Sequence, residues 1–484
     1  MKSNELLHEL IHSLTKSEKR YFSVFTSTHK EGNNYKALFD AIQSQKEYSE
    51  KELLEKFKKE DFVRQFSVAK NYLINLILRS LSGYHQKSKK TIELNNSLSE
   101  IEILYWKGLY KLALKKVNQA KKIAQKYDMS SYILLINYWE RKIEEFVSDK
   151  MVNEKAMEET ELYLNSYNQQ MKMNLLVKEL ENTTQLSIKR TDLNLESLKK
   201  LLSHDLLKLD ESKLHNFHTH VDYLHIKGVG YGILGDKDKE FESKMKLLEL
   251  MEENPHHTKE NPLQYAQTLY SILVYYLKQG YPKEYLEYRA KMDEVDLKFH
   301  HAIVSYQGRK FILELGYYLH TRDNKKVREI AVEIEDWYTS ASGIKSMRVK
   351  MIIEFNLALS YFLLNNTKKS LQWCNNSILL FDMKAQKFRH DLAISSLMIQ
   401  LFIYVDLGHN DLAMKNIETI LSIANKNKYG EVEILIFKAI KEMLKIGNLS
   451  EGIKIIKKLI ENDEAAFINL DVDVIIFWLE KKGL

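Results

Sequence analysis

The chain has 484 residues with 3 prolines and 1 cysteine, and its formal net charge is +6. Because proline is so rare and strong helix formers such as Leu, Lys and Glu dominate, we expect helix nearly everywhere. The single cysteine, Cys374, excludes an internal disulfide and indicates a reducing compartment. No run of about 18 apolar residues predicts a membrane span. The N-terminal segment is interrupted by Glu5, His8 and Glu9 and so lacks the apolar stretch of a signal peptide. We therefore expect an all-α, cytoplasmic protein.

The excess positive charge lies in residues 1–92, which contain 17 Lys and Arg against 11 Asp and Glu, whereas the remainder balances at 55 against 55. This asymmetry predicts a basic N-terminal helical domain that ends near residue 92. Thr15 with Glu18, and Ser49 with Glu52, have the spacing of a capping box, in which a hydroxyl and a carboxylate satisfy each other's backbone amides. Two helix starts are therefore predicted at these positions.

Two interpretations of residues 1–92 remain open. About five helices are predicted, the last from roughly Val63 to Leu81. The segments Leu14–Phe25 and Phe66–Leu81 look similar to the start of uncharacterised bacterial helical-repeat proteins, a resemblance that implies no known activity. The helix order also loosely resembles a helix-turn-helix, and the basic charge would suit nucleic acid. However, the third helix of that arrangement is mostly apolar and offers few polar side chains to read base edges. We prefer a structural capping domain.

The chain after residue 92 contains an internal repeat. In Ile103–Ala124, an apolar helix ends at Gly108, and Tyr110, Ala113 and Ala120 follow at helical spacing. Small residues seven apart let two antiparallel helices approach closely. This segment resembles the tetratricopeptide repeat (TPR), whose second half carries a glycine, an aromatic residue and two small residues in that order.

Comparable turn residues recur at intervals of 39 to 45 residues, a period near 43. Each is a Gly, Asp or Asn, the types that tolerate a left-handed backbone or cap a helix. The resemblance implies a right-handed α-solenoid of about nine TPR-like helical hairpins over residues 93–484, with helices longer than those of the usual 34-residue repeat. A C-terminal cap is expected from about residue 466, including Ile468–Lys482. The nine predicted turns are Gly108, Asp149, Asp192, Gly235, Gly280, Asp323, Asn365, Gly408 and Gly447.

The hexapeptide GYGILG, Gly230–Gly235, matches the fingerprint of dinucleotide-binding loops. That fingerprint requires a strand before its first glycine, whereas the apolar residues here recur at helical spacing. We therefore predict a helix that ends at the last glycine and expect no cofactor. His215, His218, Asp222 and His225 follow the same spacing and could bring two or three metal ligands to one helix stripe. A partly exposed polar stripe predicts the same pattern, so we expect no metal site.

In the TPR family, the first helices of the pairs line a concave groove that binds peptides. Aligning the predicted turns with that frame implies a groove with a mostly apolar ladder, which would suit an amphipathic helix or an extended peptide. With helices this long, the same residues could instead pack between neighbouring pairs, and both interpretations remain open. The residues implied for the groove are Asp222, His225, Gln267, Tyr270, Lys310, Leu313, Tyr317, Phe355, Met398, Phe402 and Phe437.

These features predict a non-catalytic scaffold that binds a protein or peptide on the concave face. Short turns between helices offer few long loops on which catalytic groups could converge, so we do not expect an enzyme. The alternative is a nucleic-acid-associated regulator, in which the basic head binds DNA or RNA and the TPR-like array senses a partner.

Overall fold

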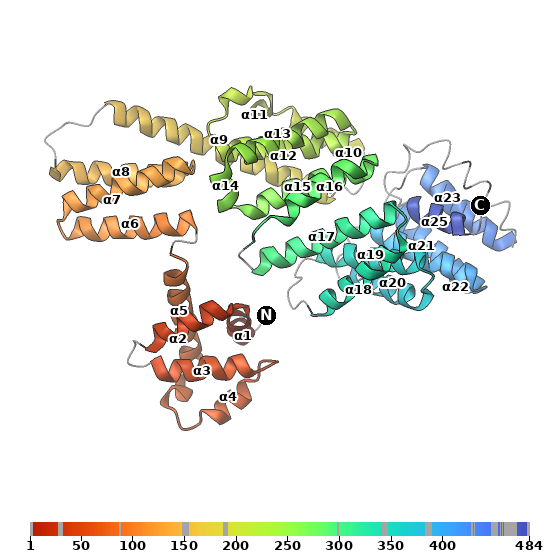
Figure 1. Cartoon of the computed structure of the whole chain (residues 1–484), viewed down its shortest axis with the longest axis horizontal. Helices are drawn as coiled ribbons and strands as arrows, with labels where there is room; N and C mark the ends of the chain where they lie inside the picture. The colour runs from red at the N-terminus through yellow and green to blue at the C-terminus, as the bar shows by residue number, and fades with distance from the viewer. Residues whose placement is uncertain are drawn as a thin grey trace. The chain divides into compact units, whose positions relative to one another are not determined.

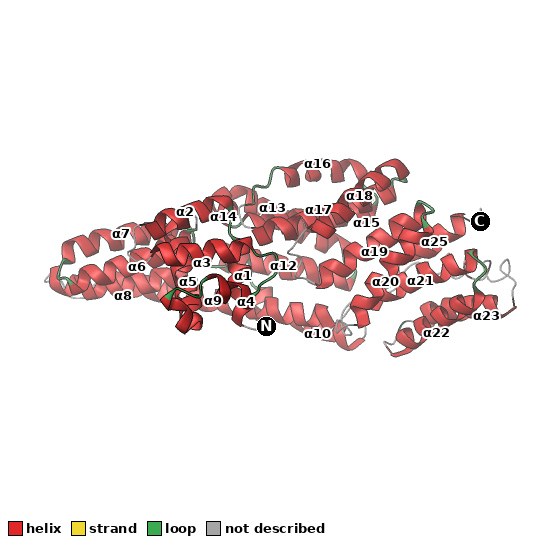
Figure 2. Ribbon diagram, turned by 90° about the horizontal axis from the view of Figure 1, so that it is seen from below, coloured by secondary structure: helices red, strands yellow, loops and turns green. Residues whose placement is uncertain are grey.

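The structure of the chain is a computed structural model (Figure 1). It describes residues 3–27, 32–86, 89–147, 154–186, 192–297, 300–340, 347–382, 390–426, 429, 431–446, 454, 456, 458 and 472–481. Within these residues the fold is all-α, as predicted: Figure 2 shows helices and loops but no strand. None of the described helices is both long and apolar enough to cross a membrane. Contacts divide the chain into unit 1, Met1–Tyr167, and unit 2, Asn168–Leu484.

Unit 1 contains two separate hydrophobic cores. One is shared by α1–α5 and includes the fully buried Leu7, Phe22 and Leu73. The other is formed by α6, α7 and α8. The residues on either side of position 92 thus pack into different cores, although the division between the units falls later, within α9. The helices are α1 (Ser3–Ser13), α2 (Lys16–Ser27), α3 (Gly32–Ser44), α4 (Glu50–Lys56), the 3₁₀ helix η1 (Asp61–Gln65), α5 (Phe66–Tyr84), α6 (Lys90–Trp106), α7 (Tyr110–Lys126), α8 (Ser130–Val147) and the start of α9 (Glu154–Leu186).

The capping box predicted at Thr15 and Glu18 is confirmed, and the one at Ser49 and Glu52 forms in part, since the Ser49 amide donates to Gln45 Oε1 (3.3 Å) and not to Glu52. At the start of α2 the Glu18 amide donates a hydrogen bond to Thr15 Oγ1 (3.2 Å), and the Thr15 amide donates to Glu18 Oε2 (2.7 Å). At the start of α4 the Glu52 amide donates to Ser49 Oγ (3.4 Å). Each cap satisfies amides that the first helical turn leaves without a partner.

Unit 2 consists mainly of antiparallel helix pairs. The two helices of each pair contact one another, and each pair also contacts the next one along the chain. The pairs are α12–α13, α15–α16, α17–α18, α19–α20 and α21–α22 (Figure 1). The bounds are α10 (Asp192–Leu202), α11 (Asp205–Lys208), the 3₁₀ helix η2 (Glu211–Lys213), α12 (Phe217–Leu234), α13 (Lys237–Glu253), α14 (Pro255–Glu260), α15 (Pro262–Gln279), α16 (Pro282–Asp293), α17 (His300–His320), α18 (Asn324–Ser340), α19 (Met347–Leu363), α20 (Thr367–Asp382), α21 (His390–Asp406), α22 (Asn410–Lys426), α23 (Glu431–Ile446) and α25 (Val472–Lys481).

The corners of the pairs fall at predicted turn residues. A left-handed backbone occurs at Gly108 between α6 and α7, and at Gly235, Gly280, Asn365 and Gly408 in unit 2. Asp323 differs slightly. The left-handed residue there is its neighbour Arg322, with φ 58°, while the Asp323 carboxylate caps α18 by accepting from the Lys326 amide (3.0 Å). Asp192 is the first residue of α10. Asp149 and Gly447 lie outside the described residues.

Helix α25 packs on α21 near the end of the chain. Trp478 is fully buried, its ring stacks on Phe402 at a centroid distance of 4.4 Å, and its indole N–H donates to Asp406 Oδ1 (3.0 Å). A buried tryptophan with a satisfied indole contributes a large apolar area without an unpaired donor. The contact therefore joins the chain end to α21.

Trp478→Ala should destabilise unit 2 by about 3–5 kcal/mol, because it removes a large buried ring and leaves a cavity. The matched control is Trp106→Ala in unit 1, where the side chain is 74% exposed and the loss should stay within about 0.5 kcal/mol. Urea denaturation followed by circular dichroism measures both. Equal denaturation midpoints for the two variants would show that α25 adds little to the fold.

Candidate functional site

A cavity of about 240 Å³ lies between four helices of unit 2. We call it the α12 cavity, because α12 contributes the most residues to its wall. The wall is part polar and part apolar, the usual composition of a ligand site. Its lining residues are Val177 and Glu181 of α9, Val221, Asp222, Leu224, His225, Gly228 and Val229 of α12, Lys244, Leu247 and Met251 of α13, and Gln264, Gln267, Thr268 and Ser271 of α15.

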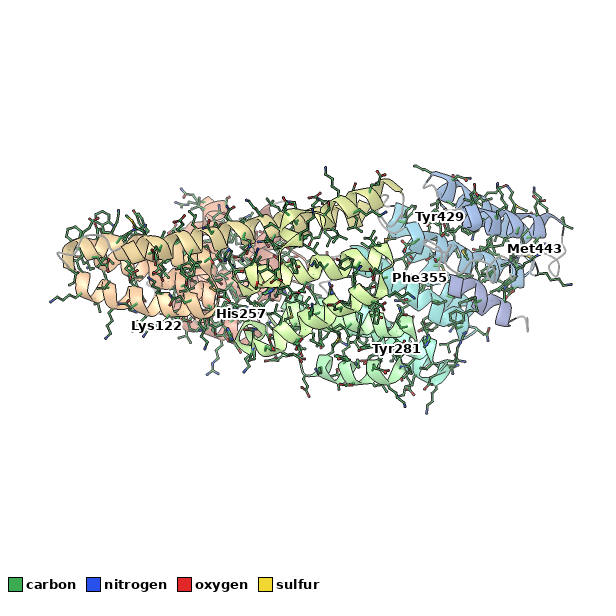
Figure 3. The ribbon with its side chains drawn as sticks, turned by 90° about the horizontal axis from the view of Figure 1, so that it is seen from above. Lys122, His257, Tyr281, Phe355, Tyr429 and Met443 are labelled. Atoms are coloured by element: carbon green, nitrogen blue, oxygen red, sulfur yellow. The ribbon has the colours of Figure 1, made fainter. Side chains whose placement is uncertain are left out.

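Three of the residues implied for the groove meet in this cavity. Asp222 and His225 lie one turn apart on α12, and Gln267 reaches the same space from α15. Local chemistry places them there. Asn216 caps α12 by accepting from the Thr219 amide (2.8 Å), and Phe217 in the first turn stacks on His257 of α14, labelled in Figure 3, at 4.0 Å. These contacts at the first turn of α12 hold the start of the helix in place, and Asp222 and His225 follow on its next turns.

The carboxylate of Asp222 is the least compensated charge of the cavity. It is half-buried, and among the described residues it has no hydrogen-bond or ion-pair partner. Burial disfavours its charged form and raises its pKa to about 6. A carboxylate kept in this state costs folding free energy, so its presence in a cavity marks a candidate binding group.

The other ionisable groups of the wall are His225, Lys244 and Glu181, and they influence one another's charge. His225 is accessible through the cavity, yet desolvation by the surrounding protein lowers the pKa of its imidazole; the nearby Glu181 opposes that shift and Lys244 adds to it. The Lys244 ammonium forms an ion pair with Glu240 on its own helix and donates to the carbonyl oxygen of Ser271 (3.4 Å). The Lys244 ammonium is therefore already bonded to other groups of the protein.

A second, larger cavity of about 640 Å³ involves Glu252 of α13, Tyr265 of α15 and Lys291 of α16. Here the polar groups satisfy one another. The Tyr265 hydroxyl donates to Glu252 Oε1 (3.0 Å), and Lys291 forms an ion pair with the same oxygen (2.8 Å). We regard this cavity as the weaker candidate for that reason.

Five of the groove residues lie in the hydrophobic core instead. Leu313, Phe355, Met398, Phe402 and Phe437 are 0–4% exposed, so none is available to a ligand on the surface, and their assignment to the groove is corrected accordingly. Phe355, labelled in Figure 3, lies on α19.

The physical reason is clearest in α21, where every residue from 392 to 403 is buried. A helix that is mostly apolar and buried on all sides is surrounded by protein and has no face to line a groove.

The three remaining groove residues are half-buried and bonded to their neighbours. The Arg309 guanidinium lies over the ring of Tyr270, 5.3 Å from its centroid. Lys310 forms an ion pair with Asp293. Tyr317 stacks on Tyr285 at 4.7 Å. None of the three lines the α12 cavity.

The histidine stripe does not assemble into a metal site. α12 begins at Phe217, so His215 precedes the helix and lies off the predicted stripe. His218 packs edge-on against His257 at 5.3 Å. Across the part of the chain that the structure describes, no three His, Cys, Asp or Glu side chains are arranged to hold a metal ion.

One motif was missed in the sequence, although its spacing is visible there. HELIH at residues 8–12 on α1 has the HExxH pattern of zinc proteases. In the structure His8 Nε2 contacts the Gln45 carbonyl oxygen (3.0 Å), and His12 is hydrogen-bonded to backbone at Ile42 and Gln45. Both imidazoles therefore satisfy carbonyl groups at the end of α3, which is a capping role.

The surface of α5 does not decide whether the N-terminal helices bind nucleic acid. α5 buries Leu73, Leu76 and Ile77 in the core. Its exposed side chains include the apolar Val68 and Leu78, but also polar ones: Asn71, Asn75 and Arg79. Base edges are read by polar side chains, so nucleic-acid binding by residues 1–92 stays an open alternative.

No protein-family model matches the chain, and no curated protein matches it either.

The glycine hexapeptide forms the end of α12 and its corner, so these residues build no strand–loop–helix of the dinucleotide type. Gly235 has φ +84°, and Gly230 lies where a Cβ atom would approach Leu202 of α10 to 2.8 Å. Gly230 thus lets α10 and α12 pack closely, a role that the sequence alone did not show.

Gly235→Ala should lower the free energy of unfolding by about 1–2 kcal/mol, because a left-handed backbone is strained in any residue with a Cβ atom. Gly228→Ala should instead be neutral or raise it by up to about 1 kcal/mol, since this position is helical and the added Cβ would meet ordinary contacts at 3.5 Å. Thermal denaturation compares the pair. Two equal losses would contradict this account of the glycines.

Asp222→Asn should stabilise the protein by about 1–3 kcal/mol near pH 7.5, because the raised pKa means that the folded state binds the proton more tightly than the unfolded state. The ordinary pKa of an aspartate is 3.8. The free-energy cost of ionising Asp222 in the folded state is therefore nearly complete above about pH 6, falls to about half at pH 5 and becomes small below pH 3.8. Urea denaturation at pH 5 and 7.5 measures the difference. Asp336→Asn, an exposed position on α18, is the control and should change little at either pH. If Asp222→Asn brought no gain in stability at pH 7.5, the result would argue against a buried, uncompensated charge.

Proposed function

We propose that this protein is a non-catalytic scaffold that binds a protein or peptide through TPR-like helix pairs of unit 2, with the α12 cavity as a recognition point. The observation that carries the proposal is the convergence of Asp222, His225 and Gln267 on one open cavity. The TPR frame assigns all three to the ligand-binding side of their helices. They are also the groove residues that the core leaves accessible together.

The arrangement of the pairs supports the same proposal. In unit 2 each described pair contacts the next one, and the corners recur at the period of about 43 that the sequence shows. Stacked pairs of this kind create extended surfaces from first helices, and such surfaces recognise peptides. A TPR-like solenoid over residues 93–484 is therefore the architecture that we propose.

The bonding inside the cavity favours recognition over chemistry. Nucleophilic catalysis needs a hydroxyl or thiol hydrogen-bonded to a base. Here the Ser271 hydroxyl donates to the Thr268 carbonyl oxygen (2.8 Å), and the Thr268 hydroxyl donates to the Gln264 carbonyl oxygen (3.2 Å). Both hydroxyls thus bond to the backbone of α15, and neither bonds to His225.

Selection of random displayed peptides on the full chain tests the proposal. We expect peptides that bind the wild-type protein and bind Gln267→Trp at least about tenfold more weakly, because the indole fills the cavity mouth. Gln372→Trp on α20 is the matched control, since Gln372 is exposed and lines neither cavity. Circular dichroism confirms that both variants fold. A selection without any peptide that discriminates between wild-type protein and Gln267→Trp would contradict the proposed function.

A further inference from the structure

We infer that the α12 cavity receives the guanidinium group of an arginine side chain presented by the partner. This inference rests on the proposed function and specifies the chemistry of the contact. It is carried by the size of the cavity, by the distribution of charge on its wall and by the apolar surface between the charged groups.

The cavity has room for one side chain and not for a large cofactor. Its volume of about 240 Å³ lies below the range of roughly 300–1,000 Å³ found for small-molecule sites. Val177, Leu247 and Met251 supply apolar wall from α9 and α13. A long side chain with a methylene stem and a charged tip matches a wall that is apolar in part and charged in part.

The charge of the wall calls for a cation. Glu181 of α9 and Asp222 of α12 bring two carboxylates to the cavity from separate helices. Asp222 has no hydrogen-bond or ion-pair partner among the described residues, and a desolvated carboxylate recovers free energy when an opposite charge with hydrogen-bond donors reaches it. An anionic ligand would face both carboxylates and is disfavoured.

The cations near the cavity do not fill this role. Lys244 pairs with Glu240 one turn earlier on α13 and reaches the Ser271 carbonyl oxygen. Lys178, one turn before Glu181 on α9, pairs with that carboxylate at 2.7 Å. The charges within each of these two ion pairs cancel to first order. What remains on the wall is the negative charge of Asp222.

The acceptors of the wall suit arginine better than lysine. They come from three directions: carboxylates on α9 and on α12, and the side-chain amide oxygens of Gln264 and Gln267 on α15. A guanidinium group carries five N–H donors in a planar fork and can serve several acceptors at once, whereas an ammonium group is a compact point charge.

Isothermal titration calorimetry of the full chain tests the inference with four probes. They are acetyl-Gly-Arg-Gly-amide, its citrulline counterpart, its lysine counterpart and agmatine. Citrulline has nearly the shape of arginine but no charge. We expect the arginine probe to bind most tightly and the citrulline probe at least about tenfold more weakly. Asp222→Asn should weaken the arginine probe by about thirtyfold or more, and Gln372→Trp should leave it unchanged.

Loss of folding cannot imitate that result, because Asp222→Asn is expected to stabilise the protein. Equal affinity for the arginine and citrulline probes, or no binding of the arginine probe, would overturn the inference. Agmatine binding as tightly as the arginine probe would overturn it as well, since the ligand would then be a small free cation.

Failure of the inference can be told apart from failure of the proposed function. Peptides that depend on Gln267 but keep their affinity when each arginine is replaced by citrulline would leave the scaffold intact and refute arginine recognition. Conversely, a cavity that binds the arginine probe while the selection gives no peptide dependent on Gln267 would refute the scaffold and support the cation site.

The affinity for the arginine probe should also depend on pH. The groups that face Asp222 are Glu181 from α9, His225 on its own helix and Lys244 from α13, while α15 contributes only uncharged side chains. Because the pKa of Asp222 is about 6, binding should be about tenfold weaker at pH 5 than at pH 7. Protonation of His225 acts in the same direction. Affinity that is constant over this range would show that Asp222 does not contact the cation.

Discussion

A pair of antiparallel helices cannot bury its own apolar stripes, and this constraint governs the structure of unit 2. Each pair is covered only when the next pair packs against it. Helices packed between neighbours therefore become buried on every side, as α21 does between residues 392 and 403. Trp478 of α25 adds a further contact by stacking on Phe402 of α21. Burial is shared between neighbours along the row, so each pair depends on the pairs beside it.

The same constraint explains which sequence predictions could succeed. Features that depend on a few neighbouring residues could be predicted: the helix caps at Thr15 and Ser49, and the glycines and asparagine at the corners, follow from local backbone chemistry. The period then followed from the corners. The ladder was less predictable, because whether Phe355 or Met398 faces solvent depends on how the neighbouring helix pairs pack and not on the residues next to it in the sequence. The mostly apolar sequence of α21, without a continuous polar face between residues 392 and 403, was the available signal that this helix is enclosed.

The candidate site, too, could be predicted from the sequence only in part. Asp222, His225 and Gln267 could be selected from the sequence through the repeat frame, but Glu181 of the 33-residue helix α9 could not, because its place in the wall depends on how α9 packs beside the other helices of the cavity. Nor could the role of Gly230, which depends on the approach of Leu202 from α10. The ionised Asp222 also lowers the free energy of unfolding, since a hydrophobic or amide side chain there would not carry the desolvation cost of a charge. Residues that oppose stability are commonly retained where binding needs them.

The α12 cavity has walls from three parts of unit 2: α9, the α12–α13 pair and α15. In an array held by neighbour contacts, the width of such a cavity depends on how one helix pair is tilted against the next. A ligand that contacts all of these walls would fix the relative orientation of the helices that form them. A bound ligand would thereby stiffen the helices that form the wall, and slower amide hydrogen exchange along α12 and α15 would be its signature.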